Sequence, residues 1–427
     1  MLKSKIVEKS LSLLGMACLI SLVSLIVALP AKATTIIFGN PATFNSSSSH
    51  YNSVDSLDSN NFVVAYKDTG NSNWGTSVVG KTDVGNLAIT YGTPVVFNSS
   101  QSDNISVATL DTTHCVIAFR EVSELSFGRA IIGTISGNSI SFGNKFTFSS
   151  GDATSISVTA LDSTHFVVAY QDINNSDYGT AVVGTVSGGN SISYGTPVAF
   201  NSAYTQFIAV SALDSTHCVV AYQDVANSDY GTAVIGTVSG DIISYGSEYV
   251  FNTQSTDDNS VSNLGSSKFV VAFEDNNSYG TAIIGTVAGS TISYGSKSNF
   301  NSGRTGSISV SKLDNTHPVI AYSDTDNSAY GTNIIGTVSG NSISYGSEYI
   351  FNSAATTYVS TSGLDTSRFI DVFEGSGQGI IGQQQEEGGG VVPEFTIVTI
   401  VIAAVAGLGI FFLIRRRNLG RSVEESK

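Results

Sequence analysis

Residues 155–195 read SISVTALDSTHFVVAYQDINNSDYGTAVVGTVSGGNSISYG, and this stretch decides the predicted fold. β-branched and aromatic residues dominate four runs, at 155–161, 166–170, 178–186 and 191–195, and clusters of Asp, Asn, Ser and Gly separate them. Such runs between turn-forming residues predict four antiparallel strands. The second run, FVVAY, is apolar throughout rather than alternating, which indicates a strand that is covered on both faces.

The same pattern recurs along the chain at a nearly constant period. A Leu-Asp or Leu-Gly dipeptide and an aromatic-Gly dipeptide both advance in steps of 53, 51, 52, 51, 49 and 51 residues. The marker leucines are Leu57, Leu110, Leu161, Leu213, Leu264, Leu313 and Leu364. Four strands in a unit of this size are typical of one blade of a β-propeller, so the chain is predicted to hold seven blades.

The two ends of the repeated region complement one another. Residues 35–45 match a fourth strand but belong to no complete unit, whereas the last unit has strands at 358–364, 369–373 and 379–382 and no fourth. Joining the two would complete the last sheet and remove exposed edges. The sequence therefore predicts an all-β protein: a seven-bladed β-propeller of four-stranded antiparallel blades at 34–382, closed by the N-terminal strand, and one C-terminal transmembrane helix. The alternative is a row of small β-sandwiches, for which these units are short.

The first 33 residues have the features of a secretory signal peptide. Three lysines precede an apolar run at 11–29, and Ala31-Lys32-Ala33 follows as a small-x-small cleavage site. Residues 1–33 are therefore predicted to be a signal peptide that is cleaved after Ala33. The alternative is an uncleaved N-terminal anchor, because the apolar run is long for a signal.

The C-terminal region is predicted to anchor the protein in a membrane. A linker rich in Gln, Glu and Gly at 383–392 leads to 19 uncharged residues, 396–414, which are enough to span a bilayer of about 30 Å as a helix. Three arginines, 415–417, and a tail, 418–427, follow. Clustered arginine stays on the cytoplasmic side, so the propeller is predicted to lie outside the cell.

Pro393, Glu394 and Phe395 stand directly before this apolar segment and its arginine cluster. Over residues 393–417 the arrangement resembles the PEF-CTERM sorting signal of archaeal surface proteins. The resemblance implies that a membrane protease of the archaeosortase type processes the tail. A plain C-terminal transmembrane anchor is the alternative, and both readings place the protein at the cell surface.

Charge and motifs narrow the classes of function. The chain of 427 residues has 12% charged residues and a net charge of −15, and residues 34–382 carry 28 acidic against 10 basic side chains. Such an acidic body argues against nucleic-acid binding. The sequence has no G-x-S-x-G, H-E-x-x-H, P-loop or C-x-x-C motif, so no catalytic residue, metal site or cofactor is predicted from motifs.

The loops between the second and third strands are the richest candidates for ligand binding. Most combine an acid, Asn and Ser with an aromatic residue, which could stack on a sugar and hydrogen-bond its hydroxyls. The predicted binding residues are Asp68, Trp74, Asp172, Tyr178, Asp224, Tyr230, Asp275, Tyr279, Asp324 and Tyr330. Oxygen-rich loops of this kind could also hold Ca²⁺. The alternative is ordinary turn chemistry, in which the acid caps its own turn and the aromatic residue packs between blades.

Histidine and cysteine recur at equivalent positions, which indicates structural roles. Four histidines share one place after the Leu-Asp turn, where they are expected to pack over the aspartate: His114, His165, His217 and His317. Cys115 and Cys218 occupy a slot that Phe fills in other repeats, so they are expected to be core residues. They lie two blades apart and are therefore not expected to form a disulfide.

These features predict a membrane-anchored cell-surface propeller that acts in binding, adhesion or envelope structure, with a glycan or protein ligand on the rim loops. The alternative is an extracellular propeller hydrolase or lyase that acts on polysaccharide. Near-uniform blades favour binding or structure, whereas one irregular blade with its own charges would favour an enzyme. The second blade departs most, through Arg120, Glu121, Glu124 and Arg129.

Overall fold

The computed structural model describes residues 34–386 except 84 and 124, and this part of the chain is all-β with antiparallel strand pairing. Its only helical turns are three 3-10 helices, η1 (Ile173–Asn175), η2 (Val225–Asn227) and η3 (Thr325–Asn327). A search of the same residues finds no helix long and apolar enough to cross a membrane. The predicted signal peptide, sorting motif, transmembrane helix and tail all lie outside the described residues.

The third repeat illustrates how the strands are used. Its first strand is the second half of β10 (Ser139–Ala160), and β11 (His165–Asp172), β12 (Tyr178–Ser187) and β13 (Ser191–Tyr194) follow in order. β14 (Val198–Ala212) pairs first with β12 and then bends to become the first strand of the next repeat. Long strands of this kind therefore belong to two consecutive repeats.

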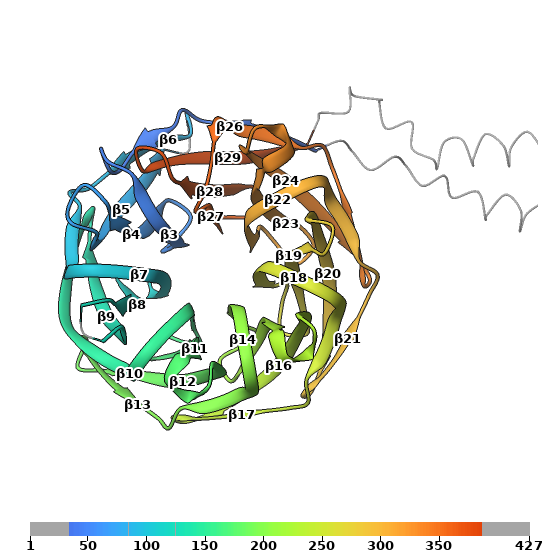
Figure 1. The fold of residues 1–427 in the computed structure, drawn as a ribbon. Coiled ribbons are helices and arrows are strands. Elements are labelled where there is room, and N and C mark those ends of the chain that lie inside the picture. The colour runs from blue at the N-terminus through green and yellow to red at the C-terminus, as the bar shows by residue number, and fades with distance from the viewer. Residues whose placement is uncertain (1–33, 84, 124, 387–427) are drawn as a thin grey trace, which may run out of the picture. The chain divides into compact units, whose positions relative to one another are not determined.

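The other repeats use the same strand order, and we number the repeats one to seven from residues 49, 102, 153, 205, 256, 305 and 356. Figure 1 shows them following one another around a ring. The remaining strands are β1 (Thr34–Phe38), β2 (Ala42–Thr43), β3 (Ser49–Ser56), β4 (Asn61–Asp68), β5 (Trp74–Asp83), β6 (Ala88–Tyr91), β7 (Val95–Asp111), β8 (His114–Glu121), β9 (Phe127–Ser136), β15 (His217–Asp224), β16 (Tyr230–Ser239), β17 (Ile242–Tyr245), β18 (Tyr249–Asn263), β19 (Lys268–Asp275), β20 (Tyr279–Ala288), β21 (Thr291–Tyr294), β22 (Ser298–Lys312), β23 (Pro318–Asp324), β24 (Tyr330–Ser339), β25 (Ser342–Tyr345), β26 (Tyr349–Ala355), β27 (Ser360–Gly363), β28 (Arg368–Phe373) and β29 (Gln378–Glu386).

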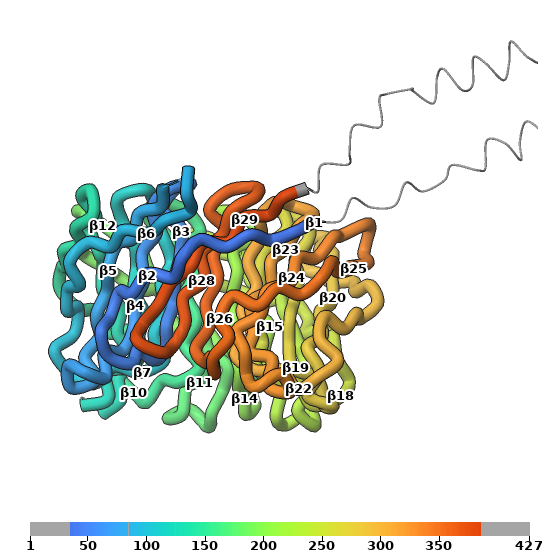
Figure 2. The backbone as a smooth tube through the Cα atoms, turned by 90° about the horizontal axis from the view of Figure 1, so that it is seen from above, coloured from blue at the N-terminus to red at the C-terminus, as the bar shows by residue number. Residues whose placement is uncertain are grey.

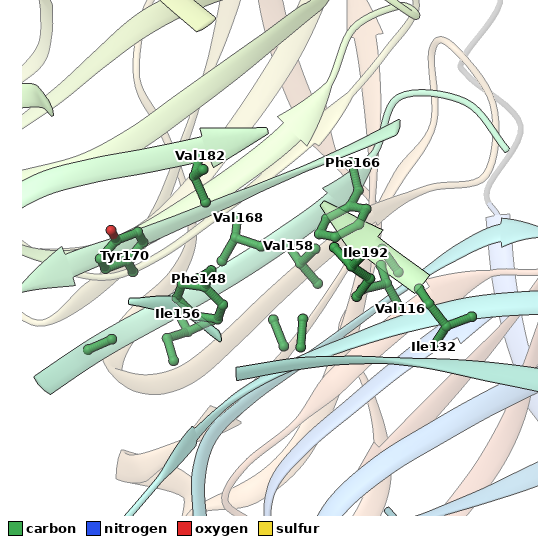
Figure 3. Close-up of a cluster of buried hydrophobic side chains, with 14 of the residues drawn as sticks. Val116, Ile132, Phe148, Ile156, Val158, Phe166, Val168, Tyr170, Val182 and Ile192 are labelled. Atoms are coloured by element: carbon green, nitrogen blue, oxygen red, sulfur yellow. The ribbon is translucent and has the colours of Figure 1, made fainter. Parts of the chain in front are cut away.

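Hydrophobic side chains are buried between the sheets of neighbouring repeats. Figure 3 shows the cluster between repeats two and three, where Val116 and Ile132 lie in the same core as Phe166 and Val168. The five residues of the FVVAY run in β11 expose at most 1% of their surface, so this strand is covered on both faces, as predicted. The Phe166 ring lies directly on Gly184, where an added Cβ would approach it to 2.1 Å. Each buried large apolar side chain of this kind stabilises the fold by about 1.5–3 kcal/mol.

The N-terminal strands complete the sheet of repeat seven. In that sheet β1 pairs with β29, and the order continues through β28 to β27. β2 pairs with β29 as well, and the backbone N–H of Gly39 donates to the carbonyl oxygen of Ile381 at 2.9 Å. Figure 2 shows β1 and β29 running side by side, although they come from opposite ends of the described chain. The predicted pairing of the N-terminal segment with the last repeat is therefore confirmed.

The last strand is longer than its sequence pattern indicates. β29 ends at Glu386, so the predicted boundary between residues 382 and 383 falls inside a strand. The residues from 383 onward are Gln and Glu, which do not resemble a buried strand. They extend the strand because the backbone of β1 runs alongside, where Thr35 Oγ1 donates to the carbonyl oxygen of Gln385 at 3.4 Å. Backbone pairing, rather than side-chain hydrophobicity, thus decides where this strand ends.

Polar side chains on the first strands join neighbouring repeats. Each first strand is the innermost strand of its sheet, so half of its backbone N–H groups have no partner within that sheet. The backbone N–H of Val210 donates to Ser157 Oγ of the preceding repeat at 3.1 Å. The same link joins repeats seven and one, where the N–H of Val54 donates to Ser360 Oγ at 3.1 Å. The serines of the first strand therefore satisfy backbone donors of the next repeat.

Candidate functional site

The rim-loop residues predicted to bind a ligand lie at the turns between second and third strands, one loop to a repeat. Asp275 Oδ1 accepts hydrogen bonds from the backbone N–H groups of Asn277 at 2.8 Å and Tyr279 at 3.0 Å, so it caps its own turn. Asp68 likewise accepts a bond from the N–H of Gly70 at 3.0 Å. These two carboxylates behave as the alternative of ordinary turn chemistry predicts.

The other rim-loop aspartates also stand at the start of a turn, but their side chains form no capping hydrogen bond. Asp172, Asp224 and Asp324 each stand immediately before one of the three 3-10 turns. The aromatic residues begin the third strands and are half-buried: Trp74, Tyr178, Tyr230, Tyr279 and Tyr330. Among the described residues, no hydrogen bond, ion pair or ring contact joins predicted binding residues of two different loops. Ligand binding by individual rim loops therefore stays a prediction.

Histidine and cysteine have the structural surroundings that their repetition predicts. In the four histidine turns, Nδ1 lies 2.8–3.0 Å from a carboxylate oxygen of the aspartate three residues earlier. Cys115 and Cys218 are buried with free thiols, and burial raises the pKa of each to about 12. A search of the described part of the chain finds no group of three or more His, Cys, Asp or Glu side chains placed to hold a metal ion.

The charged residues of repeat two, the predicted place for an enzymatic site, are engaged in ion pairs. Glu121 exposes only 2% of its side chain and pairs with Arg129 at 3.0 Å and with Lys145. Arg120 donates two hydrogen bonds of 2.8 Å to the carboxylate of Asp152. Glu124 lies outside the described residues. A buried carboxylate held by two cations has a structural role.

One residue in the first strand of repeats one to six, and one just before β27 in repeat seven, has a left-handed backbone, with φ between 47° and 50°. The seven residues are Tyr51, Asn104, Ser155, Phe207, Asp258, Ser307 and Tyr358. Non-glycine residues rarely adopt this conformation, bulky aromatic ones least of all, and each instance costs on the order of 1 kcal/mol. The strain lies at a break in strand register, between His50 and Ser53 in repeat one and at the equivalent place in the others where the pairing is given.

These seven residues converge on one cavity of about 330 Å³, which we call the loop-side cavity. It is lined by Tyr51, Asn52, Asn104, Ile105, Ser155, Ile156, Phe207, Asp258, Asn259, Ser307, Ile308, Tyr358 and Val359. All seven repeats contribute to it, so it lies at the centre of the ring in Figure 1. Binding residues are often found where a rigid scaffold brings several chain segments together in this way.

Residue type varies around the loop-side cavity, whereas the framework is nearly uniform. The left-handed position holds Tyr, Asn, Ser, Phe, Asp, Ser and Tyr in turn, while the middle of the second strand reads Val, Val or Ile, Ala, and Tyr or Phe in six repeats. Part of the left-handed set has a structural role: Asn104 Oδ1 accepts from the N–H of Ser155 at 3.0 Å, and Asp258 Oδ2 accepts from the N–H of Ser307 at 2.9 Å. The three aromatic members form no such side-chain hydrogen bond. Hydrogen bonding between repeats therefore does not explain why aromatic residues occupy these positions.

Two asparagines in the cavity wall leave polar atoms without partners. Asn52 is 7% exposed, and its Nδ2 donates to the carbonyl oxygen of Tyr358 at 3.3 Å, while Oδ1 has no partner within the described residues. Asn259 repeats this arrangement, with Nδ2 donating to the carbonyl oxygen of Phe207 at 3.2 Å and Oδ1 unpaired. The other repeats have Ile or Val here. Each unpaired buried acceptor costs about 1–3 kcal/mol.

Aromatic and charged side chains meet at the edge of the cavity formed by repeats seven, one and two. The rings of His50 and Tyr358 are stacked with centroids 4.9 Å apart, and His50 Nε2 lies 2.8 Å from a carboxylate oxygen of Glu374. The Tyr51 and Tyr358 rings are 5.2 Å apart. Lys67 Nζ lies 5.6 Å from the centre of the Tyr51 ring. The charges on this side are therefore held next to aromatic rings.

In repeat five, by contrast, three acidic residues lie close together. Asp257 on β18 is directly across from Glu274 on β19, and Asp258 is adjacent in the chain. Burial raises the pKa of all three carboxyl groups, and neighbouring negative charges raise each of the three pKa values further. Like charges directly opposite each other on paired strands are destabilising. Within the described residues no lysine, arginine or histidine forms an ion pair with any of the three.

A second central cavity, of about 340 Å³, is lined by the ends of the first strands near the Leu-Asp turns. Its two charged side chains are Asp55 and Lys312. Asp55 accepts hydrogen bonds from the N–H and hydroxyl of Thr109, each at 2.8 Å, and Lys312 donates to Asn263. These charged groups are already hydrogen-bonded, so we regard the loop-side cavity as the candidate site.

No protein-family model matches this chain, and no curated protein sequence matches it. The left-handed residues, Asn52 and Asn259 were not among the residues predicted from sequence. Their only signal in the sequence is a departure from the repeat, since YNSV and DNSV stand where other repeats have SISV or a close variant.

Proposed function

We propose that residues 34–386 form a seven-bladed β-propeller in which each numbered repeat is one blade. Three observations support this proposal: seven units of the same strand order, the pairing of β1 and β2 with β29, and the hydrogen bond from Val54 to Ser360 that joins the last repeat to the first. Pairing of the chain ends within one sheet leaves no free sheet edge between the first and last blades.

The propeller is a binding protein that acts at the cell surface, in adhesion or in the envelope, and takes a glycan in its loop-side cavity. The observation that carries this proposal is the contrast between a repeated apolar framework and a cavity whose seven strained positions hold five different residue types. Aromatic side chains offer faces for a sugar ring, and the asparagine, serine and aspartate residues of the lining offer polar groups for its hydroxyls. A protein ligand at the same cavity is the second possibility for the partner.

Display at the surface is supported by the two ends of the sequence. The signal peptide predicted at 1–33 would direct export, and the apolar segment at 396–414, followed by arginines, would hold the propeller outside the membrane. Processing by a sorting protease at Pro393-Glu394-Phe395 belongs to the same proposal. Mass spectrometry of the C-terminal peptide from purified membranes tests it: a peptide that ends near this motif supports processing, and an intact Lys427 supports a plain anchor.

Cleavage of polysaccharide is the alternative activity, and one observation favours it. His50 is held between the ring of Tyr358 and the carboxylate of Glu374 at the edge of the cavity. An imidazole oriented by a carboxylate is a suitable general base or acid when a substrate proton is within reach. This arrangement predicts turnover that is lost in His50→Ala and in Glu374→Gln, measured as new reducing ends or unsaturated products.

A glycan-binding screen on the purified full-length protein in detergent tests the binding proposal. Tyr358→Ala should weaken the binding of any ligand found by roughly tenfold or more, because an aromatic face in the cavity is lost. Trp74→Ala, on a rim loop, is the matched variant and should leave binding unchanged. Loss of binding in Trp74→Ala with no loss in Tyr358→Ala would place the site on the rim loops and contradict the cavity. Product formation in the same samples would decide for the enzyme.

A further inference from the structure

A lysine, an asparagine and a glutamate from three strands meet where repeats one and two join. Lys145 Nζ, on β10, donates a hydrogen bond of 2.8 Å to Oδ1 of Asn98 on β7, and it also donates to the carboxylate of Glu121 at the end of β8. Asn98 and Glu121 are each only 2% exposed, whereas 34% of the lysine side chain is exposed. The lysine therefore reaches from near the surface to two buried polar groups.

The amide group of Asn98 is held with its carbonyl towards the lysine. Its Nδ2 donates to Ser102 Oγ at 2.9 Å and to the carbonyl oxygen of Ser100 at 3.3 Å, so Oδ1 is the atom left for Lys145. The amide carbon Cγ is bonded to that oxygen and lies next to Nζ. A nucleophile held against the carbon that it attacks can react as if its concentration were about 10⁵–10⁸ M.

The ion pairs of Glu121 leave one positive charge in excess. Its carboxylate pairs with Arg129 at 3.0 Å as well as with Lys145, so one acid faces two cations in a place that water reaches poorly. Conversion of the lysine into a neutral amide would leave a balanced pair of Glu121 with Arg129. Electrostatics at this site therefore favours a reaction that removes the charge of Lys145.

We propose that Lys145 and Asn98 form an intramolecular isopeptide bond, with Glu121 as the catalytic residue. Glu121 takes a proton from the ammonium group, and neutral Nζ attacks Cγ of Asn98. The attacking nitrogen then releases a second proton, and Glu121 returns its own proton to Nδ2 as the bond between Cγ and Nδ2 breaks. Ammonia leaves and carries the second proton away as ammonium. The reaction needs no other molecule and does not depend on the proposed glycan binding.

Repeat five contains the same lysine and asparagine without the carboxylate. Lys297 Nζ donates to Asn252 Oδ1 at 2.7 Å, and these residues occupy the positions of Lys145 and Asn98. Asp275 stands where repeat two has Glu121, but it is shorter by one methylene and caps its own turn. No ion pair joins Lys297 to an acid within the described residues, so this pair is expected to stay unlinked. The other repeats have Pro or Glu at the lysine position: Pro41, Pro94, Pro197, Glu248 and Glu348.

Mass spectrometry of a tryptic digest of the purified, unfolded full-length protein tests the proposal. Trypsin does not cut after a lysine whose amine is in an amide bond. The linked protein should therefore give peptide 82–120 joined to peptide 130–268, with the mass of one ammonia molecule lost. Cleavage after Lys297 should be normal and Asn252 should be unmodified, which makes repeat five the control within the same chain.

Two variants separate the chemistry from the contacts. Glu121→Gln keeps the size of the side chain but cannot take up the proton, and Lys145→Arg keeps the positive charge but replaces the amine by a guanidinium group. Both should give the unlinked peptides at full mass. Lys145→Arg should also melt roughly 5 °C or more below the unchanged protein, because the link closes a loop of 47 residues in the unfolded chain. Lys297→Arg is the matched control and should leave the melting temperature unchanged.

Three results would count against the proposal. Separate peptides at full mass from the unchanged protein would overturn the isopeptide bond. Conversion of Asn98 to aspartate without a link would also overturn it, because water rather than Lys145 would then be the nucleophile. An equal yield of linked peptide from Glu121→Gln would overturn the catalytic assignment of Glu121.

Discussion

Replacing Asp371 by asparagine should remove a pH dependence of stability that this one carboxyl group creates. Asp371 lies in β28 and is fully buried, at a position where the other six repeats have Val or Ile. Asn333 on β24 is also fully buried, where four of the repeats have Ala. The apolar core in this region forms two small clusters, one around Phe369 and one around Phe373, instead of one large cluster. Two polar residues, Asp371 and Asn333, therefore lie in the core beside the sheet that joins the two chain ends.

The magnitude follows from the difference between the folded and unfolded proteins. Burial raises the pKa of Asp371 to about 7, and its interactions with Thr361 and Asn333 offset the burial only in part. In an unfolded chain the pKa of aspartate is about 3.9. Between these values the folded state holds a proton that the unfolded state has released, so stability falls as the pH rises from about 4 to about 7 and is then constant. The total loss is on the order of 4 kcal/mol.

Urea unfolding at about pH 5 and about pH 8 measures this effect. The amide of Asp371→Asn resembles the protonated acid and cannot ionise, so the variant should lack this contribution and be more stable than the unchanged protein at pH 8. Asp162→Asn is the control. Burial works to raise the pKa of Asp162, but hydrogen bonds from Thr164 and His165 outweigh it and lower the value to about 2, below the window. Parallel pH profiles for Asp371→Asn and the unchanged protein would refute the reasoning.

Two further predictions concern the contacts that join the repeats. Ile36→Ala should lower the free energy of unfolding by about 2–5 kcal/mol, because Ile36 of β1 is buried against Phe369. Ile37 is 40% exposed, so Ile37→Ala should lower the free energy of unfolding far less. Urea unfolding compares them, and equal losses would contradict the role of β1 in the last sheet. Ser157→Ala should lower the melting temperature through a loss of about 1–2 kcal/mol, because the N–H of Val210 loses its acceptor; an unchanged melt would show that water replaces the serine.

Much of the fold could be predicted from sequence because the relevant signals are local. Apolar runs such as 166–170 are flanked by turn residues, and the spacing of those turns repeats along the chain. The complementary ends, 35–45 and 358–382, were enough to predict that β1 pairs with β29. The histidine turns were also predictable, since Asp162 and His165 are three residues apart and need only the geometry of one turn.

Less of the candidate site could be predicted, because its residues are brought together from separate repeats. The sequence pattern predicted ligand binding at rim loops such as 172–178, where polar and aromatic residues are close together in the chain. The loop-side cavity instead combines Tyr51 with Tyr358 and Asp258, which no spacing in the sequence relates. The left-handed backbone at these residues has no glycine to mark it.

The amino-acid sequence by itself therefore determined the strands, their number in each repeat and the pairing of the chain ends, because strand and turn propensities act over a few residues. Only the tertiary structure decided which side chains share the central cavity and which buried polar groups lack a partner. Asn52 and Ile105 occupy equivalent places in their repeats, and only the surroundings in three dimensions show that one leaves an unsatisfied oxygen. Hydrogen-bond satisfaction and charge pairing depend on distances between segments about 50 residues apart, and those distances exist only once the sheets have packed.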